Sequence, residues 1–379
     1  MRILVIGGGV GGLSAALALH KAGAEVTVYE AHPASGDDIG AFLTLATNGM
    51  IALAQVDAAR PVADAGFPLT SMRVTGTDGA ALATVPLGRH DEPLARYRCL
   101  RRAELCAALR AEVLGRGIPV RHGRRLVSVD EGADEVVARF ADGDGAAGDL
   151  LVAADGLNSA TRAVVDPDCG PPRYAGQRVF YGYTTTAFGE PERIEMIRGS
   201  AAAFGHAVSP AGETYWFARV AGAALTAGEL TGGSPEAWRE HLLPLLRPDA
   251  TVAADIVAAT GERLMATNAS DLPPGGRWRT ARTLLIGDAA HAASPATGQG
   301  ASMAMEDAVV LAKALRDAPS TEAALEAYER LRRPRVELNT ATSARLTASR
   351  APARRPGTGP AGVPDEEEVV RTLDWSAPL

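Results

Sequence analysis

Three glycines near the beginning of the chain have the spacing of a dinucleotide-binding turn. Gly7, Gly9 and Gly12 follow a short apolar run, residues 2–6, and precede an Ala/Leu-rich stretch that ends at Gly23. In such a turn the first glycine permits a tight bend, the second lets the backbone approach a pyrophosphate, and the third lets helix and strand pack closely. The N–H groups and the dipole at the start of the helix would then favour the phosphates.

An acidic residue completes this pattern. Glu30 ends a second predicted strand, residues 25–30, at the place where a carboxylate accepts hydrogen bonds from a ribose. Both NAD and FAD bind to such a unit, so these residues leave the choice of cofactor open. A structural glycine-rich turn followed by an unrelated glutamate is the simpler alternative.

Two more motifs with an aspartate occur later in the chain, each after an apolar run. Residues 154–162 read ADGLNSATR, and residues 287–291 read GDAAH. Placed after a buried strand, Asp288 can accept hydrogen bonds from sugar hydroxyls. Residues 295–300 then read PATGQG, whose glycines allow the backbone to approach a ligand closely, in front of a helix N-terminus that favours an anion.

With these motifs in this order, the chain resembles the FAD-dependent aromatic hydroxylases related to p-hydroxybenzoate hydroxylase. The pattern is most similar to that of members such as urate hydroxylase and zeaxanthin epoxidase, and the resemblance covers residues 1–345. It implies that ADGLNSATR touches FAD and the nicotinamide nucleotide, and that Asp288 binds ribityl or ribose hydroxyls. It also implies that residues 295–300 lie against the isoalloxazine ring, followed by a helix with the family's MEDA, residues 305–308.

The resemblance implies further FAD contacts outside these motifs. Arg102 matches a family arginine near the FAD phosphates and ribityl chain, with Arg101 as a close alternative. The complete set of implied cofactor-binding residues is Gly7, Gly9, Gly12, Glu30, Ala31, Thr44, Arg102, Leu126, Asp155, Gly287, Asp288, Pro295, Gly298, Gln299, Gly300 and Ala301. No second nucleotide fingerprint, with this glycine spacing between a strand and a helix, occurs, and no CxxxxC is present, which argues against the disulfide reductases with two dinucleotide sites. NAD(P)H would therefore be a transient reductant without a Rossmann domain of its own.

Aromatic residues gather in the segment 204–219, which is similar to the family's substrate-domain sheet. Because side chains alternate along a strand, Tyr215 and Phe217 should point one way and Trp216 the other. One of these two sets would face the flavin, and the other would pack in a core or meet solvent.

The predicted catalytic residues are Pro295, Tyr215 and His206. Pro295 matches the family's proline, whose backbone helps to shape the oxygen pocket, and Tyr215 is a candidate substrate contact, as are Tyr181 and Tyr183. His206 is the only histidine of the aromatic segment and a candidate base. An ordinary hydrogen-bonded histidine is the alternative.

The sequence says less about how a substrate is held. Family members that act on carboxylated phenols often bind the carboxylate with arginines or tyrosines, and Arg198 and Arg219 are the candidates here. A pocket for a neutral, larger molecule is the other interpretation. His291 in GDAAH is expected to be structural. No His or Cys cluster has metal-ligand spacing, so no metal is predicted.

The resemblance implies a reaction. NAD(P)H would reduce FAD, and O2 would add at the flavin C4a to give a hydroperoxide that hydroxylates or epoxidises a small aromatic or polycyclic substrate. Water must be excluded so that the hydroperoxide does not decompose to H2O2. The alternatives are a reductase or another oxidoreductase on the same scaffold, and a flavoprotein that binds a ligand without turnover.

The pattern of strands and helices that would position these residues predicts an α/β fold. It would consist of a Rossmann-type FAD-binding domain, a β-rich substrate domain and a long C-terminal helix. The FAD-binding domain is expected to comprise residues 1–72, 95–172 and 280–345, the substrate domain residues 73–94 and 173–279, and the tail residues 346–379. Residues 69–86 are predicted to form a hairpin that turns at Asp78-Gly79, and the last helix to be interrupted at Pro334.

Composition limits the other classes of function. The net charge is −7 with no large basic block, which argues against a nucleic-acid partner. No apolar stretch approaches the roughly 18–20 residues of a membrane span, and the three cysteines share no CxxC spacing and cannot all pair. We therefore expect a cytoplasmic protein, monomeric or homodimeric, with O2 and a small molecule as partners.

Overall fold

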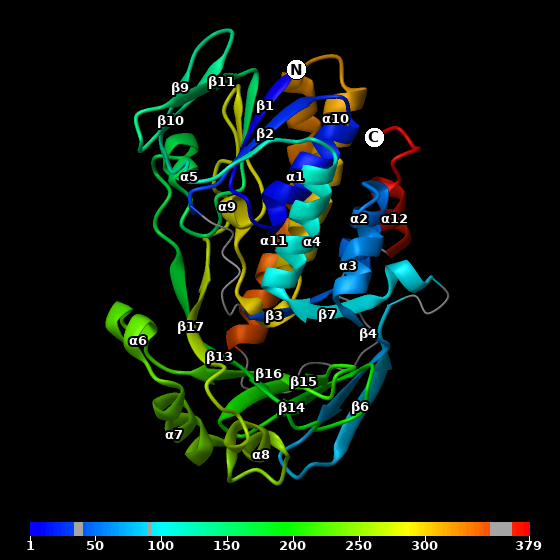
Figure 1. Cartoon of the computed structure of the whole chain (residues 1–379), viewed down its shortest axis with the longest axis vertical. Coiled ribbons are helices and arrows are strands. Elements are labelled where there is room, and N and C mark those ends of the chain that lie inside the picture. Colours follow the sequence, from blue (N-terminus) through cyan, green and yellow to red (C-terminus); the bar gives the residue numbers. More distant parts are fainter. Residues whose placement is uncertain (34–40, 89–91, 349–365) are drawn as a thin grey trace.

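The computed structural model describes residues 1–33, 41–88, 92–348 and 366–379. A five-stranded parallel sheet has the order β18-β12-β1-β2-β8, and α1, Val10–Lys21, connects β1 to β2 (Figure 1). Its strands are β1 Arg2–Ile6, β2 Glu25–Tyr29, β8 Val120–Arg121, β12 Leu150–Ala153 and β18 Thr283–Leu285. This confirms the predicted α/β class with a Rossmann-type unit.

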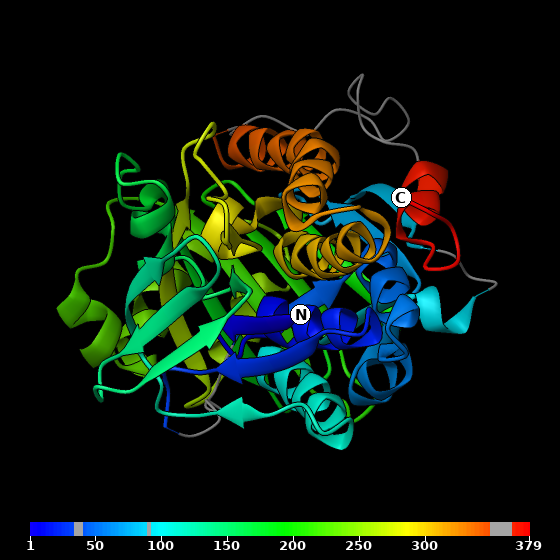
Figure 2. The same cartoon turned by 90° about the horizontal axis from the view of Figure 1, so that it is seen from above.

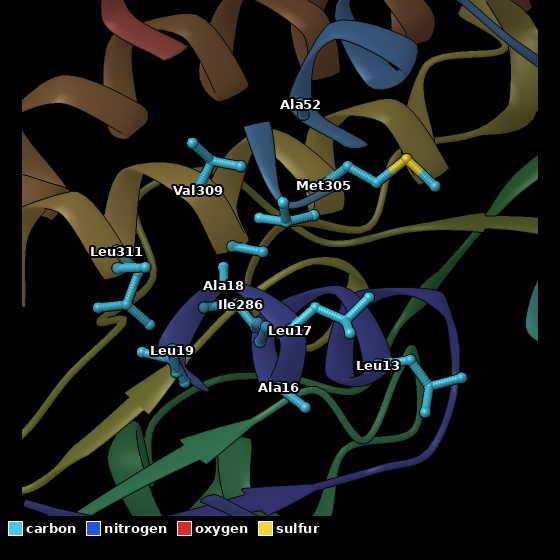
Figure 3. Close-up of a cluster of buried hydrophobic side chains, with 14 of the residues drawn as sticks. Leu13, Ala16, Leu17, Ala18, Leu19, Ala52, Ile286, Met305, Val309 and Leu311 are labelled. Atoms are coloured by element: carbon cyan, nitrogen blue, oxygen red, sulfur yellow. The ribbon is translucent and has the colours of Figure 1, made fainter. Parts of the chain in front are cut away.

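The parallel sheet is covered on both faces, as its continuous apolar strands require. Along β1, Ile3 and Val5 face the helices, whereas Leu4 and Ile6 face a small antiparallel sheet, β11-β10-β9. Figure 3 shows the helical side, where α1 packs against α10. The helices there are α4 Arg102–Gly115, α10 Gly300–Asp317 and α11 Thr321–Ala348. The small-sheet side contains β9 Leu126–Glu131, β10 Val136–Phe140, β11 Gly145–Gly148, α5 Ala160–Val165 and α9 Asp288–His291.

A second sheet of seven strands lies below the parallel sheet in Figure 1 and has the order β17-β13-β16-β15-β14-β5-β6. Its strands are β5 Ser71–Thr75, β6 Ala81–Pro86, β13 Arg173–Thr184, β14 Arg193–Arg198, β15 Ala202–Val208, β16 Thr214–Ala221 and β17 Leu264–Asp271. Helices α7 Pro235–Leu246 and α8 Ala253–Ala258 pack on its face that carries Phe180 and Trp216, with α6 Ala227–Gly232 beside them. The region that the sequence indicates as β-rich therefore also supplies helices.

The hairpin predicted over residues 69–86 is confirmed. β5 and β6 pair antiparallel, and the turn between them places Gly79 at a φ of 75° while the Asp78 carboxylate accepts the Ala80 N–H at 3.0 Å. β5 then pairs parallel with β14, which adds the hairpin to the edge of the seven-stranded sheet.

A separate three-stranded sheet joins the two regions. Its order is β3-β7-β4, with β3 Phe42–Leu45, β7 Tyr97–Arg101 and β4 Phe67–Leu69. The helices α2 Thr47–Gln55 and α3 Ala59–Ala65 and the 3-10 turn Pro93–Ala95 flank it. β4 ends at Leu69, two residues before β5 begins, so this sheet leads the chain into the seven-stranded sheet.

The predicted interruption at Pro334 is wrong, because α11 runs without a break from Thr321 to Ala348. Proline inside a helix costs about 3 kcal/mol. Here the residues on either side are held in place, since Arg332 and Arg335 both bind the buried Glu306 of α10. These tertiary contacts keep the helix continuous through a residue that would end it locally.

The C-terminal segment packs back onto the molecule. α12, Glu366–Leu373, contacts α2 and α10, as the red helix in Figures 1 and 2 shows. The fully buried Lys313 of α10 donates to the carbonyl oxygens of Thr372 and Asp374 at 2.7 and 2.6 Å. The Trp375 N–H donates to Gln55 at 2.8 Å, so the end of the chain is tied to two helices.

Candidate flavin site and active site

A cavity of about 570 Å³ opens at the carboxyl ends of β1 and β2. It brings together many of the residues predicted to bind a cofactor, although they are far apart in the sequence. The predicted residues that line it are Gly7, Gly9, Glu30, Ala31, Arg102, Leu126 and Asp155. A ligand at this position lies outside the carboxyl ends of parallel strands, where nucleotides bind in folds of this type.

The three glycines of the first turn have different reasons to be glycine. Gly7 has a φ of 106°, and a Cβ on it would collide with the Ala154 carbonyl, just as a Cβ on Gly12 would collide with Gly7. For Gly9, by contrast, no protein atom lies within 4 Å of the Cβ position. Internal packing therefore explains the first and third glycines, whereas the middle one leaves room for a group that approaches the backbone.

The N-terminus of α1 also fits a phosphate-bearing group. Gly9 is its N-cap, no side chain caps it, and its first turn carries no acidic residue. Free N–H groups at a helix N-terminus attract anions. A diphosphate would satisfy these donors at the position that Gly9 leaves open.

Glu30 bridges the glycine turn and the end of β2. Its two carboxylate oxygens accept the Gly8 N–H at 2.6 Å and the His32 N–H at 2.8 Å. A carboxylate has about four acceptor sites, so oxygen lone pairs remain for ribose hydroxyls. These two backbone donors hold the Glu30 side chain at the edge of the cavity, and its contact with a ribose stays a prediction.

Basic residues surround the same cavity, and the sequence analysis missed most of them. Arg102 is accompanied by His32, Arg110, His122, Arg124 and Arg125. The signal was the basic run RHGRR, residues 121–125, which begins at the last residue of β8. These charges favour an anionic ligand such as a dinucleotide diphosphate.

The ADGLNSATR motif builds a turn rather than offering a free carboxylate. Asp155 accepts hydrogen bonds from the Ser159 hydroxyl at 2.6 Å, the Thr161 hydroxyl at 3.0 Å and the Thr161 N–H at 3.1 Å, which fixes the start of α5. Arg162, the last residue of the motif, is buried and donates to the carbonyls of Leu157 at 2.7 Å and Ala289 at 3.1 Å. It thereby joins this motif to GDAAH, a role that the sequence did not reveal.

Asp307 of the MEDA segment binds both ends of the GDAAH motif. It accepts the Gly287 N–H at 2.9 Å, His291 Nε2 at 2.6 Å and Arg332 Nε at 2.7 Å. Although burial would raise the pKa of Asp307, the charges of His291 and Arg332 lower it below its ordinary value. His291 is thus a structural partner, as expected.

The loop predicted to meet the flavin ring lies beside Thr44 and Asp288. A Cβ on Gly298, whose φ is 66°, would be 3.5 Å from the Thr44 hydroxyl, and a Cβ on Gly300 would be 3.9 Å from Asp288 Oδ1. Four predicted residues therefore meet around the start of α10, which no side chain caps. Ala301 follows them in the first turn of α10 and packs partly against the main core.

Other side chains fix this loop from both sides. Asn48 donates to Gln299 at 3.1 Å and to Glu306 at 2.6 Å. On the other side Ser294, which precedes Pro295, is bonded to the Thr347 hydroxyl of α11 at 2.7 Å. The loop is thus tied to three helices, which suits a segment that must approach a planar ring closely.

An aromatic face of the seven-stranded sheet reaches toward this loop through Phe42 of β3. The Phe42 ring is surrounded by four rings at centroid distances of 5.8–6.3 Å, those of Tyr181, Tyr183, Tyr215 and Phe217. Phe42 is two residues before Thr44 on the same strand. The aromatic face and the predicted flavin loop are therefore adjacent.

The predicted alternation along β16 is confirmed. Trp216 points away from Tyr215, stacks on Phe204 at a centroid distance of 5.4 Å and donates to the Thr260 hydroxyl at 2.9 Å. His206 lies across from Trp216 in the neighbouring strand and so faces the helices α7 and α8, not the aromatic face. Burial lowers the pKa of His206 to about 4. The structure does not bring His206 together with Tyr215 or Pro295.

The two neighbouring arginines of LRRAEL have separate positions. Arg102 lines the cavity, whereas Arg101 donates to Glu213 at 2.9 Å and lies over the rings of Tyr183 and Tyr215 at 5.0 and 5.3 Å. Arg102 is thus the arginine at the cavity, and Arg101 packs on the aromatic face.

Two further results concern only the part of the chain that the structure describes. Within it, no three His, Cys, Asp or Glu side chains are grouped so that they could hold a metal ion. None of its helices has the length and apolar character needed to cross a bilayer.

Comparisons with known proteins agree with this site. A family model described as "FAD binding domain" matches residues 1–343. The chain is 31% identical to the aurachin C monooxygenase/isomerase of Stigmatella aurantiaca, covering 91% of this chain and 88% of that protein. It is 32% identical to an FAD-dependent urate hydroxylase of Klebsiella pneumoniae subsp. pneumoniae, covering 89% and 87%.

A solved structure of an FAD-binding protein is also similar to this chain. The crystal structure of Klebsiella pneumoniae HpxO complexed with FAD and uric acid is similar with a TM-score of 0.81 and 30% identity, over 92% of this chain and 88% of that one. The resemblance inferred from the motifs and the expectation of FAD are therefore confirmed. This chain belongs to the family of FAD-dependent hydroxylases that act on aromatic substrates, and it is an FAD-dependent monooxygenase.

Proposed function

We propose that this protein uses NAD(P)H to reduce its FAD and transfers one oxygen atom of O2 to a small aromatic or polycyclic substrate, by hydroxylation or epoxidation. The observation that carries the proposal is the aromatic face around Phe42, which adjoins the loop beside Thr44. Aromatic rings bind planar aromatic molecules by stacked and edge-to-face contacts. The bound flavin would supply the oxygen-transfer chemistry.

The chain's own residues would act in two groups. The first holds the cofactor: the glycine turn and Glu30 bind the adenosine half, and Asp288 binds the ribityl hydroxyls. In the second group Pro295 shapes the space over the ring, and Tyr215 contacts the substrate. Burial raises the pKa of Tyr215 to about 12, so its hydroxyl stays protonated and able to donate at neutral pH.

The two groups correspond to a division of the chain. We propose that residues 1–70, 95–172 and 280–345 form the FAD-binding domain and that residues 71–94 and 173–279 form the substrate domain. The first boundary differs by two residues from the one expected, because β5 begins at Ser71 within the seven-stranded sheet. The substrate would bind between the two domains, beside the linking strand β3.

The experiment is aerobic oxidation of NADH and NADPH by the FAD-loaded protein. The compounds offered are phenols, polyketide aromatics, purines and terpenes, among them uric acid and 3-amino-4-hydroxybenzoate, after the names of similar proteins. We expect one class to accelerate oxidation and to gain an atom of 18O from 18O2 without an equal amount of peroxide. Turnover under anaerobic conditions would instead identify a reductase. Binding without acceleration by any compound would identify a flavoprotein without turnover.

A further inference from the structure

A cavity of about 450 Å³, which we call the inner cavity, lies between the helices α2, α10, α11 and α12. It shares no lining residue with the cofactor cavity at the glycine turn. Gln299, in the loop predicted to meet the flavin ring, lines it. Tyr97 of β7 also lines it and packs partly against the aromatic face around Phe42. The inner cavity therefore adjoins both the flavin loop and the aromatic face.

The wall of the inner cavity near the flavin loop has hydrogen-bonding groups for a ligand. Thr47 is only 6% exposed, and its buried hydroxyl has no hydrogen-bond partner among the residues that the structure describes. Gly88 packs closely on this hydroxyl, since a Cβ at position 88 would lie 2.6 Å from Thr47 Oγ1. The Gln299 side-chain oxygen accepts from Asn48 at 3.1 Å, which leaves the Gln299 NH2 group as a donor. A buried hydroxyl without a partner costs free energy, and a ligand that supplies the partner removes this cost.

The charge in the wall of the inner cavity is already compensated within the protein. Its charged lining residue, Arg335, binds the buried Glu306 carboxylate through both Nε and Nη2 at 2.5 Å. Arg332 and Asp307 complete this group, which thus contains two arginines and two carboxylates. An anionic ligand would compete with these carboxylates for the arginines. The inner cavity therefore favours a neutral group that forms hydrogen bonds.

An adjoining cavity of about 440 Å³, which we call the apolar cavity, extends the inner cavity away from the flavin loop. The two cavities share Ile51 and Val370 as lining residues. The apolar cavity lies between α2, α12 and the 3-10 turn that precedes β7. Apart from Gln55 and the exposed Glu92, its lining residues are apolar, and Leu94 among them is 40% exposed. A polar cavity is thus followed by an apolar surface that the protein leaves partly uncovered.

We propose, on the basis of the function proposed above, that these two cavities bind the hydrocarbon chain of a neutral aromatic substrate. The polar group that joins the ring to the chain would bind to the Thr47 hydroxyl and the Gln299 amide in the inner cavity. The chain would pass Ile51 and Val370 and enter the apolar cavity. The ring would remain between the aromatic face and the flavin loop. Of the two substrate types that the sequence leaves open, this arrangement favours the larger, neutral one.

The first test measures binding of methyl, propyl and hexyl 4-hydroxybenzoate to the FAD-loaded protein without NAD(P)H. These neutral esters have the same ring and differ only in the length of the chain. Flavin absorbance reports binding beside the flavin, and equilibrium dialysis reports total binding. Each buried methylene group strengthens binding by about three- to fourfold, so we expect the hexyl ester to bind at least about 30-fold more tightly than the methyl ester. Equal binding of the three esters would overturn the proposal. So would a dependence on chain length that dialysis detects without any change in the flavin spectrum, because the chain would then bind away from the flavin.

Two variants test the path of the chain. Val370→Trp and Leu94→Trp each place an indole ring in the apolar cavity. The preference for the hexyl ester should fall to less than about fourfold, the effect of one methylene group, while the methyl ester binds as before. The matched control is Leu82→Trp, which puts the same ring on an exposed leucine of β6 and should keep the full preference. A preference that survives in both cavity variants would show that the chain binds elsewhere, and the proposal fails.

Thr47→Val tests the polar end separately. Valine has nearly the shape of threonine but no hydroxyl, so all three esters should bind about 3- to 10-fold less tightly, with the same dependence on chain length. The thermal midpoint should not fall, because the hydroxyl has no partner within the described protein. A midpoint several degrees lower, or unchanged binding of the esters, would contradict the proposal. None of these measurements involves turnover. A protein that binds the esters as expected but never oxygenates them would contradict only the proposed function.

Discussion

Replacing Asp307 with asparagine tests whether the GDAAH motif depends on the buried charges beneath it. The carboxylate is fully buried and accepts hydrogen bonds from the Gly287 N–H, from His291 and from Arg332. Asparagine has nearly the same volume, so no cavity is created. The substitution removes one charge and half of the acceptor capacity at a point where three donors converge.

The expected loss is large, because removal of one partner of a buried ion pair leaves an uncompensated charge. Such a loss costs about 3–5 kcal/mol. In Asp307→Asn, Glu306 still binds the Arg332 guanidinium and neutralises part of its charge. The loss of stability should therefore lie near the lower end of that range. Gly287 would lose its charged acceptor, so we also expect faster release of FAD.

The assay is urea unfolding of the FAD-loaded protein, with flavin fluorescence as a second signal. The matched control is Asp317→Asn on the same helix, whose carboxylate binds Arg316 near the surface. An exposed pair of this kind is worth about 1 kcal/mol or less. If Asp307→Asn unfolds at the same urea concentration as the control, the buried cluster does not stabilise the motif and the reasoning is refuted.

The pH dependence gives an independent check of the same residue. The pKa of Asp307 is below its ordinary value in the folded protein, so its stabilising effect is complete above the unfolded pKa of about 3.9 and is lost as the pH falls further. The difference in stability between the natural protein and Asp307→Asn should therefore shrink as the pH falls below about 4. A difference that grows on acidification would contradict this sign.

Three other predictions follow from single positions. Gly9→Ala should leave the fold intact but weaken FAD binding at least about 10-fold. Gly12→Ala should instead destabilise the protein, because only the Cβ at position 12 would meet protein atoms. Flavin titration of the two apoproteins and their unfolding curves distinguish these two effects. Lys313→Met should free the segment around Trp375 at a cost of about 1–3 kcal/mol, seen as faster proteolysis of the C-terminus, and an unchanged cleavage rate would show that this lysine does not hold the tail. Cys99 should not react with a thiol reagent in the folded protein, because burial raises its pKa and excludes the reagent, so modification at Cys99 before unfolding would contradict the model.

Much of the cofactor site could be predicted from the sequence because its requirements are local. A turn that must bend at Gly7 and admit a phosphate at Gly9 needs glycine at those positions in any surroundings, and Glu30 follows at the end of the next strand. The resemblance added Arg102 and Leu126, which line the same cavity. Their roles at the cofactor stay predictions until FAD binding is measured with variants.

The supporting contacts could not be predicted, because they join residues that are distant in the sequence. Arg162 reaches the Ala289 carbonyl, and Asn48 reaches Gln299. Neither partner shows a periodicity or a spacing that points to the other. The unbroken helix at Pro334 has the same cause, since buried ion pairs on both sides outweigh a local preference.

The sequence by itself determined the order of the motifs, the Rossmann-type unit and the alternation of side chains along β16. Alternation fixes which residues of one strand share a face, but it does not say which face the helices cover. That was decided by the pairing between strands, which sets His206 beside Trp216 under the helices and leaves Tyr215 and Arg219 on the aromatic face. The reason is that strand register depends on packing between residues far apart in the chain, and only the folded structure specifies it.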